Sequence, residues 1–168
     1  RPLSLAGKIV WARPTNVAYY GIGPGTTRST YGAYMDNRTV LGAGAAWEVV
    51  RGLTINAGLA YDLATSGQNT YGGGPAVNVT FPPAEIEGFG RWIHYMVPAL
   101  TLQYDTRDNV SLPSKGGIYS ASYYRYQSLG SGSFSFNQFE LDARRFIGLG
   151  RPRMVLALHG GLIAQQTG

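Results

Sequence analysis

The chain has 168 residues, of which 44% are hydrophobic and only 14% are charged, with a formal net charge of +5. An ordinary soluble domain has about 25% charged residues. The Arg and Lys residues lie mostly near predicted strand ends and turns, which argues against a nucleic-acid-binding surface. With no Cys, the chain has neither disulfides nor thiolate metal sites. The 24 Gly and 12 Tyr favour a β-rich protein with many turns, or a transmembrane barrel with aromatic girdles.

The first predicted strand covers residues 3–11, where apolar and mixed positions alternate with a period of two. Arg13-Pro14 ends it, because Pro cannot donate a hydrogen bond to a strand ladder. A loop over residues 15–28 follows and contains the sequence YYGIGPG. A phosphate-binding loop would need a following helix, whereas the next residues alternate like a strand, so these glycines indicate tight turns.

Residues 29–50 show the clearest alternation in the chain. The even positions hold every charge of this segment (Asp36, Arg38 and Glu48) and most of its glycines. Strands of soluble proteins usually have about 5–6 residues, and a tilted membrane strand needs about 9–11 to cross the hydrocarbon. This segment is longer than both. We therefore expect a membrane strand whose more polar first half projects beyond the bilayer.

The return strand is predicted over residues 53–63, after a tight turn at Arg51-Gly52. Residues 64–91 are rich in Gly, Pro and Asn and are predicted to form a long loop. Such a loop is uncommon in a compact soluble domain but typical of the extracellular side of an outer-membrane barrel.

Four more strands are predicted, which brings the total to seven. Bacterial single-chain barrels have an even number of strands from about eight upward, and a bilayer does not tolerate open sheet edges. We therefore expect an all-β fold, an antiparallel transmembrane β-barrel of which residues 1–168 are one partial domain. The start at Arg1 rather than Met agrees with an excerpt from a longer polypeptide. The predicted strands and their connections are 95–104, 117–126, 136–144 and 154–165, joined through 105–117, 127–133 and 148–153.

The sequence predicts no catalytic residue, no metal site and no cofactor site, and hence no enzyme. His94 and His159 are the only histidines, and they are not spaced like a metal-binding pair. No GxSxG motif is present. Asp105 and Asp108 flank Arg107, which favours a charge-paired turn over a catalytic acid pair.

The charged residues on the predicted interior face have two interpretations. They could line a selective pore, or they could form cross-strand ion pairs in a hydrated interior, which we favour. Tyr and Trp residues near strand ends could bind sugars, but more often form a membrane-interface belt. The interior charges are Lys8, Asp36, Arg38, Glu48, Asp62, Glu140, Asp142 and Arg144. The belt residues are Trp11, Trp47, Trp92, Tyr95, Tyr119 and Tyr123.

Three segments in this order resemble the outer-membrane β-barrel assembly family (BamA/TamA-like, the bacterial surface antigen domain). They are YYGIG at residues 19–23, LQYDTRDN followed by LPSKGGIYSASY over residues 102–123, and FELDARRFIGL at residues 139–149 with the strand after it. The resemblance covers almost the whole chain. The motif residues are Tyr19, Tyr20, Gly21, Gly23, Asp105, Arg107, Asp108, Pro113, Gly116, Asp142 and Arg144.

The resemblance implies a sixteen-stranded barrel in the outer membrane of a Gram-negative type envelope. Such barrels usually follow periplasmic POTRA repeats, and they insert or export other outer-membrane or secreted proteins. A client strand pairs with an opened edge between the first and last strands. The chain would supply about the fifth to the eleventh strand, without POTRA repeats and without the first and last strands. The turns at 51–52, 105–117 and 148–153 would be periplasmic, and the loops 13–28, 64–94 and 127–133 extracellular.

Two alternatives remain open at this stage. The first is a passive porin-like or passenger-display barrel whose extracellular loop 64–94 binds a ligand. The second is a soluble β-sandwich enzyme or lectin. If the chain belongs to an outer-membrane assembly barrel, the expected partners are the lipid bilayer, outer-membrane or secreted protein clients, and POTRA domains of the same full-length chain. No nucleic acid is expected.

Overall fold

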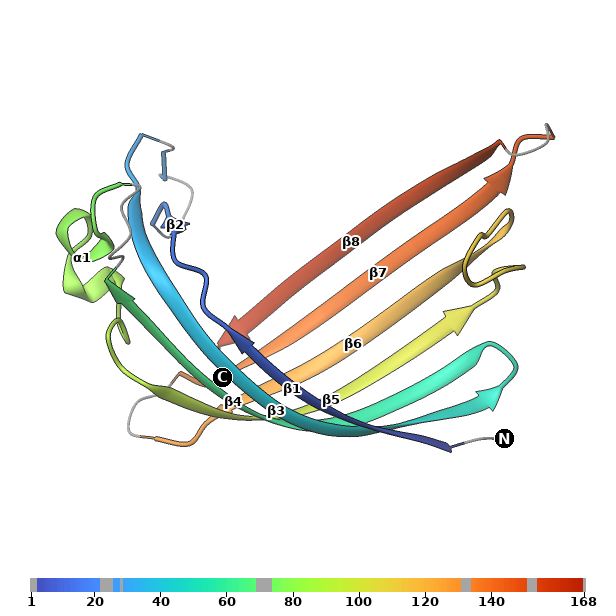
Figure 1. Cartoon of the computed structure of the whole chain (residues 1–168), viewed down its shortest axis with the longest axis horizontal. Coiled ribbons are helices and arrows are strands. Elements are labelled where there is room, and N and C mark those ends of the chain that lie inside the picture. The colour runs from blue at the N-terminus through green and yellow to red at the C-terminus, as the bar shows by residue number, and fades with distance from the viewer. Residues whose placement is uncertain are drawn as a thin grey trace.

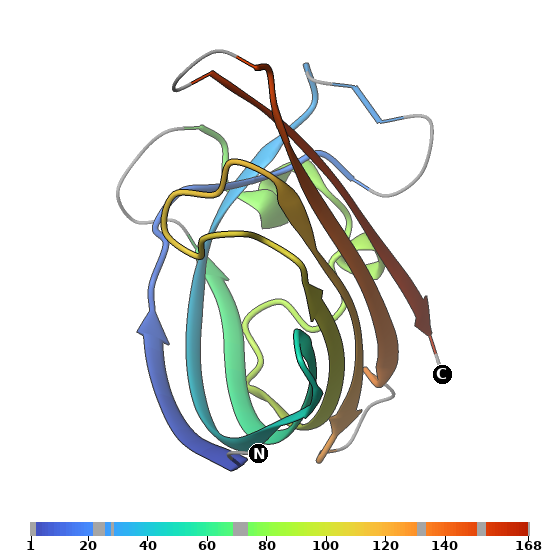
Figure 2. The same cartoon turned by 90° about the vertical axis from the view of Figure 1, so that its right-hand side faces the viewer.

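The chain folds into one strongly curved antiparallel sheet, which confirms the all-β antiparallel fold expected from the sequence (Figure 1). The computed structural model describes residues 3–21, 26–27, 29–68, 74–130, 134–150 and 154–167. The sheet forms an open trough with β1 at one rim and β8 at the other (Figure 2). Its strands are β1 (Leu3–Ala12), β2 (Val17–Tyr19), β3 (Gly32–Val50), β4 (Leu53–Gln68), β5 (Ile93–Asp105), β6 (Gly116–Ser128), β7 (Phe136–Gly148) and β8 (Val155–Thr167).

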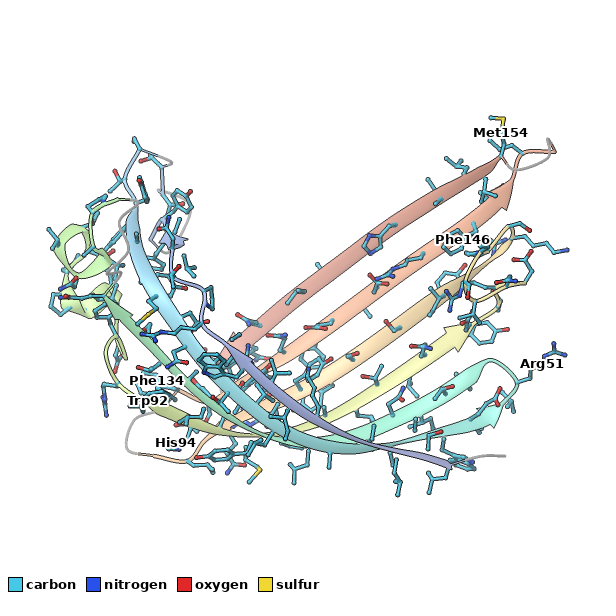
Figure 3. All side chains as sticks on the ribbon, viewed as in Figure 1. Arg51, Trp92, His94, Phe134, Phe146 and Met154 are labelled. Carbon is cyan, nitrogen blue, oxygen red and sulfur yellow. The ribbon has the colours of Figure 1, made fainter. Side chains whose placement is uncertain are left out.

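The strand order is β1-β3-β4-β5-β6-β7-β8, with the short β2 beside the beginning of β3. The short connections from β3 to β4, β5 to β6 and β7 to β8 therefore lie at one end of the sheet. The connections from β1 to β3, β4 to β5 and β6 to β7 lie at the opposite end (Figure 1). We call these the turn end and the loop end. Figure 3 shows Arg51 and Met154 at the turn end and Trp92 at the loop end.

The register separates the side chains into a concave and a convex set. Even-numbered residues of β3 and β4 face the concave side, together with the odd-numbered residues of β5 that pair with them, as in Ala60↔Val97. The odd-numbered residues of β3 and β4 face the convex side, as the alternation predicts. All eight charges expected on the interior face lie at concave positions.

Small residues occupy the concave side where β3 and β4 bend. Gly44 lies opposite Gly58, and a Cβ built on Gly44 would lie 2.9 Å from the carbonyl oxygen of Ala57. Any larger side chain at position 44 would therefore push the two strands apart. Glycine in a strand often marks such a close approach or a tight bend, so the curvature of the trough is encoded at these positions.

Several strands begin or end at other residues than predicted, and one predicted loop contains a strand. The predicted loop 15–28 includes β2, and β3 begins at Gly32 rather than at residue 29. β4 continues to Gln68, and β7 continues to Gly148. A strand ladder is formed by backbone groups, so it continues through polar residues where the apolar alternation has already ended. The described part of the chain therefore has eight strands where the pattern predicted seven.

The predicted loop 64–91 is also partly folded. After β4 it forms the short helix α1 (Val77–Thr80) and the 3₁₀ turn η1 (Pro83–Glu85). We call residues 74–91 the loop-end cap. In the described part of the chain no helix has the length and apolar character needed to cross a membrane.

The loop-end cap packs against β2 and the beginning of β3. Among the described residues four hydrophobic side chains are buried, and three of them (Ala33, Val77 and Phe81) lie at this contact. The N–H of Ala33 donates to the carbonyl oxygen of Pro75 at 2.8 Å. A Cβ on Gly32 would lie 2.5 Å from the Cα of Val77, so only glycine allows this approach. The tightest apolar packing is thus at the loop end rather than within the sheet.

Candidate functional site

The convex face is apolar and exposed. Leu41 is 47% exposed and Leu59 is 52% exposed, although both lie at the centre of long strands. At the convex positions of the described strands only Arg125 and Arg145 carry a formal charge, and both lie near a strand end. The exposed convex leucines and isoleucines of the described strands are Leu3, Leu5, Ile9, Leu41, Leu59, Leu100, Leu102, Leu141, Ile147, Leu156, Leu158 and Leu162.

The concave face carries paired charges. The Arg38 guanidinium binds the Asp62 carboxylate through Nη2 and also through Nε, which lies 3.0 Å from both carboxylate oxygens. The Asp62 side chain is only 3% exposed, so its charge requires this partner. The pair bridges β3 and β4 diagonally, since Val40 is the residue directly opposite Asp62. It is a cross-strand ion pair of the kind favoured for the interior charges.

A second concave cluster joins β7 and β8. The Asp142 carboxylate accepts from Arg144 Nε at 3.0 Å and lies 2.5 Å from His159 Nε2. Asp142 and Arg144 were singled out as motif residues, whereas His159 was given no role. Its position could have been found from the turn between β7 and β8, because the resulting register places His159 opposite Arg144.

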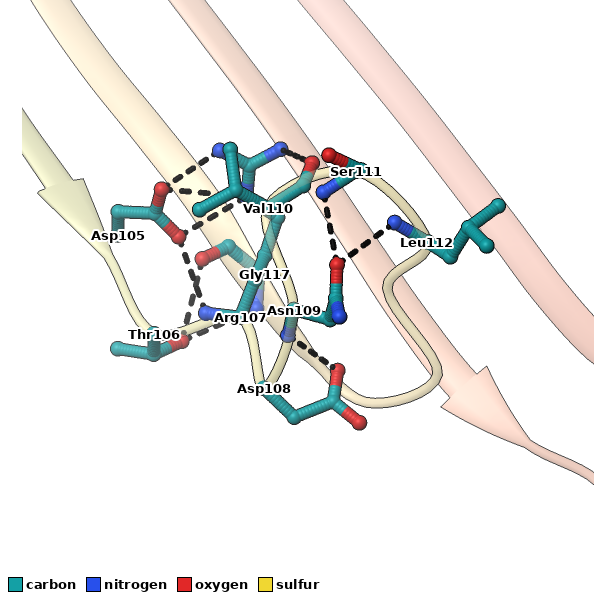
Figure 4. A network of polar contacts seen from close by, with 9 residues as sticks. All are labelled: Asp105, Thr106, Arg107, Asp108, Asn109, Val110, Ser111, Leu112 and Gly117. Carbon is teal, nitrogen blue, oxygen red and sulfur yellow. Dashed lines mark hydrogen bonds and ion pairs between the residues drawn. The ribbon is translucent and has the colours of Figure 1, made fainter.

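The connection between β5 and β6, residues 106–115, is held by hydrogen bonds of its own side chains (Figure 4). The Arg107 guanidinium binds both oxygens of Asp105, and its Nη1 donates to the carbonyl oxygen of Val110 at 3.1 Å. These two charged side chains are only 16% and 22% exposed. The guanidinium hydrogen bonds lower the pKa of the Asp105 carboxyl below its ordinary value. Asp105 and Arg107 are therefore the charge pair expected of this turn.

Asp108 does not share in the charge pair expected of this turn. Its carboxylate forms hydrogen bonds with residues that follow it in the chain rather than with Arg107. Its carboxylate accepts from the hydroxyl of Ser114 and from the backbone N–H groups of Asn109, Ser114 and Lys115, at 2.9–3.1 Å for the N–H groups. These hydrogen bonds, led by that of the Ser114 hydroxyl, lower the pKa of Asp108. A carboxylate saturated by donors in this way closes a turn and is a poor general base.

Glycines let this connection approach its neighbours. Gly116 has φ +91°, and a Cβ there would lie 2.1 Å from the carbonyl oxygen of Thr106. Gly52, in the turn between β3 and β4, has φ +81°, and its carbonyl oxygen accepts from the N–H of Asp105 at 2.7 Å. The turn between β3 and β4 therefore contacts the start of the β5–β6 connection through the backbone. Pro113 is half-buried in this connection.

The first motif lies at the opposite end of the sheet. The Tyr19 ring packs edge-on against Phe81 with centroids 4.9 Å apart, and its hydroxyl donates to the carbonyl oxygen of Glu85 at 3.0 Å. The Tyr20 ring is 6.1 Å from that of Tyr31. Gly21 has φ +91° and packs against Phe81. Gly23 lies outside the described residues.

The structure does not bring the motif residues together into one site. Those of residues 105–116 are at the turn end, Tyr19 and Gly21 are at the loop end, and Asp142 lies between them on the concave face. One predicted belt residue is wrong: Tyr95 faces the concave side, where its ring packs against Tyr126 and Phe136. In β4 the even-numbered residues face the concave side, whereas in β5 the odd-numbered residues do. The alternation therefore places Tyr95 on the concave side.

Within the described residues, no three His, Asp or Glu side chains are grouped so as to hold a metal ion. Comparisons with protein-family models, with curated proteins and with solved structures give no match to this chain.

Proposed function

We propose that this chain is part of an outer-membrane β-barrel that inserts or translocates other outer-membrane or secreted proteins. The proposal that the chain lies in a membrane rests on the convex face. Its leucines are exposed across neighbouring strands, and a face of this kind needs an apolar environment. On the concave face Arg38 pairs with Asp62 and Arg144 pairs with Asp142, as charges in a hydrated barrel interior would.

Aromatic residues near both ends of the convex face support the same proposal. Trp11 and Trp92 lie near the loop end and are 71% and 53% exposed, and Trp47 near the turn end is 50% exposed. Tyr104 and Tyr119 pair across β5 and β6 near the turn end. Aromatic side chains at two levels are typical of the two interfaces of a bilayer. Arg125 and Arg145 lie near strand ends, where a long side chain can reach the interface.

The open edges agree with a sheet that is completed by further strands. Neither β1 nor β8 has a second neighbouring strand among the described residues. In a bilayer their unpaired backbone groups would each cost several kcal/mol (about 2–7 by transfer measurements), so the proposal requires pairing partners on both sides.

The assembly or translocation activity is supported by the resemblance of the motifs to the outer-membrane assembly family. The DTRDN segment and the glycine that follows it form the densely hydrogen-bonded turn described above, which gives the motif a structural reason. Asp105, Arg107 and Asp108 hold strand register in this proposal and do not act on a client.

Site-directed spin labels test the membrane part. Labels replacing Leu41 and Leu59 on the convex face should report contact with lipid-soluble oxygen. Labels at the neighbouring concave positions Gly42 and Gly58 should report a water-soluble relaxant instead. Absence of this alternation, or the reverse pattern, contradicts a lipid-facing convex surface.

Reconstitution of the full-length protein into liposomes tests the activity. An unfolded outer-membrane client added from urea should fold faster into these liposomes than into empty ones of the same lipid composition. Ion conductance without accelerated client folding would contradict insertion activity and would favour a passive barrel.

A passive or passenger-display barrel with ligand-binding extracellular loops is a second candidate function. The observation that favours it is the folded loop-end cap, which forms an open cavity with β2, β3, β4 and β5.

A further inference from the structure

A cavity of about 400 Å³ lies between the loop-end cap and the concave side of the sheet. Its walls come from the ends of β2 to β5 and from residues 85–89 of the cap. Small-molecule sites in proteins have volumes of about 300–1,000 Å³. The cavity is therefore large enough for a small organic ligand.

The charged residues that line this cavity are all acidic. They are Asp36 of β3 and Glu85 and Glu87 of the cap, and the described residues of the lining include no Lys or Arg. In the described part of the chain, none of the three carboxylates forms a hydrogen bond or an ion pair with another side chain. Arg38, two residues along β3 from Asp36 on the same face, is already bound to Asp62. Among the described residues, no cationic side chain is thus bound to the carboxylates of the cavity.

Aromatic rings supply much of the remaining wall. Tyr19, Tyr34, Phe89 and Tyr95 all line the cavity. Two of these rings are held by their neighbours, since Tyr19 packs on Phe81 and Tyr95 packs against Tyr126 and Phe136. Burial and the Glu85 carboxylate raise the pKa of the Tyr19 phenol, so it stays neutral. The faces of neutral phenol rings attract cations.

The backbone positions of two of the three acidic residues, Glu85 and Asp36, are also held by hydrogen bonds. The carbonyl oxygen of Glu85 accepts from the Tyr19 hydroxyl at 3.0 Å, and its N–H donates to Pro82 at 2.9 Å. The N–H of Asp36 donates to the carbonyl oxygen of Pro14 at 3.0 Å. A ligand would therefore meet carboxylates carried by backbone that is already ordered, which reduces the entropy lost on binding.

We infer that this cavity binds a small organic cation, an ammonium group attached to an apolar body. The ammonium group lies among Asp36, Glu85 and Glu87, and the apolar body contacts the rings of Tyr34 and Tyr95. This inference concerns the cavity alone and holds whether or not the barrel inserts client proteins. Its ligand class follows from the combination of unpaired carboxylates and aromatic walls, since either one alone would be less selective.

Three probes of similar shape and different charge test the inference by titration calorimetry. They are 2-phenylethylammonium, neutral 2-phenylethanol and anionic phenylacetate, each added to the folded full-length protein in non-ionic detergent micelles at low salt. The cation should bind about 10-fold or more tightly than the alcohol, and phenylacetate should bind most weakly. Raising the salt concentration should weaken binding of the cation and leave the alcohol unchanged.

Charge-removing variants locate the site. The double variant Glu85→Gln with Glu87→Gln should weaken 2-phenylethylammonium binding about 10-fold, and Asp36→Asn should weaken it about 3-fold. Glu48→Gln is the control matched to Asp36→Asn: it also removes one negative charge from the concave face, but at the turn end, and should leave the affinity unchanged. Glu85 and Glu87 are exposed and Gln keeps their shape, so we expect the double variant to fold, which circular dichroism would verify.

Equal affinities for the cation and the alcohol would overturn the inference. So would an unchanged affinity in the folded double variant, or equal losses in that variant and in Glu48→Gln. None of these outcomes depends on client insertion, so failure here is distinguishable from failure of the proposed barrel activity.

Discussion

The two ends of this sheet are held together by different interactions. At the turn end, side chains such as Asp105 and Asp108 bind guanidinium and backbone N–H groups of their own connection. At the loop end, a folded cap buries Val77 and Phe81 against the beginning of β3. The connection between β5 and β6 is therefore stabilised locally, whereas the long connection between β4 and β5 depends on contacts between residues far apart in the chain.

This difference also bears on function. At the turn end Asp105, Arg107 and Asp108 are bound within their own connection, while the loop end has, beside aromatic rings, three acidic residues that pair with no other described side chain. A rigid, self-contained end suits the maintenance of strand register. The packed cap with its cavity suits recognition.

Phe81→Ala should have the largest effect, and it should be confined to the loop end. The ring is 8% exposed and packs on Tyr19, and truncating a buried Phe costs about 3–5 kcal/mol. We expect local opening of the cap, measured as about 100-fold faster hydrogen exchange at the amides of Ala33 and Val79. Val79→Ala, at a position that is 78% exposed, is the control.

If Phe81→Ala also accelerated hydrogen exchange throughout β6 to β8, the two ends would form one cooperative unit. That result would contradict separate stabilisation of the turn end and the loop end. Equal effects of the two alanine variants would mean that the cap does not depend on the Phe81 ring.

Gly116→Ala should come next and should act at the turn end. The new Cβ would meet the carbonyl oxygen of Thr106 at 2.1 Å at a residue with φ +91°. Backbone strain of this kind costs about 1–3 kcal/mol, and the clash adds to it. Gly150→Ala isolates the clash, because Gly150 also has a positive φ (+71°), but a Cβ built there meets no atom of the described residues within 4 Å. Urea unfolding in micelles should show a clearly larger loss for Gly116→Ala. Similar losses would mean that the connection relaxes.

The smallest effect should be the pH dependence of the turn end. The pKa of Asp108 is lowered on folding, so its ionised form stabilises the folded state above the unfolded pKa, ordinarily 3.8. That stabilisation should be lost progressively as the pH falls below about 4. Asp105 should behave likewise, because Arg107 lowers its pKa too.

Asp108→Asn should therefore be less stable than the unmodified protein at pH 7 and should lose less stability on acidification. Thermal unfolding at pH 7 and at pH 3 measures both. Because Asp108 is exposed, added salt should reduce the difference. An acid-induced loss that Asp108→Asn leaves unchanged would show that the turn does not depend on this carboxylate.

Much of the fold was predictable because the alternation of side chains is a local property of each strand. Residues 29–50 place Asp36, Arg38 and Glu48 on one face whatever the rest of the chain does, and the structure agrees. The tight turn at Arg51-Gly52 was equally local. Strand ends were not predictable in this way: β4 runs on to Gln68 through residues that carry no apolar pattern.

The pairing of charges was only partly predictable. The sequence placed Arg38 and Asp62 on the interior face, but their contact depends on the register of β3 with β4. The same holds for Asp142 and His159 across β7 and β8.

By itself the sequence determined the two faces of the sheet, the order of its strands and the turns that reverse it, since alternation and turn chemistry act over a few residues. Only the tertiary structure decided that residues 74–91 form a packed cap. Its contacts join Gly32 to Val77 and Tyr19 to Glu85, positions more than forty residues apart. Contacts between such distant segments depend on how the strands place them in space, and a cavity lined by Asp36, Glu85 and Glu87 exists only after that placement.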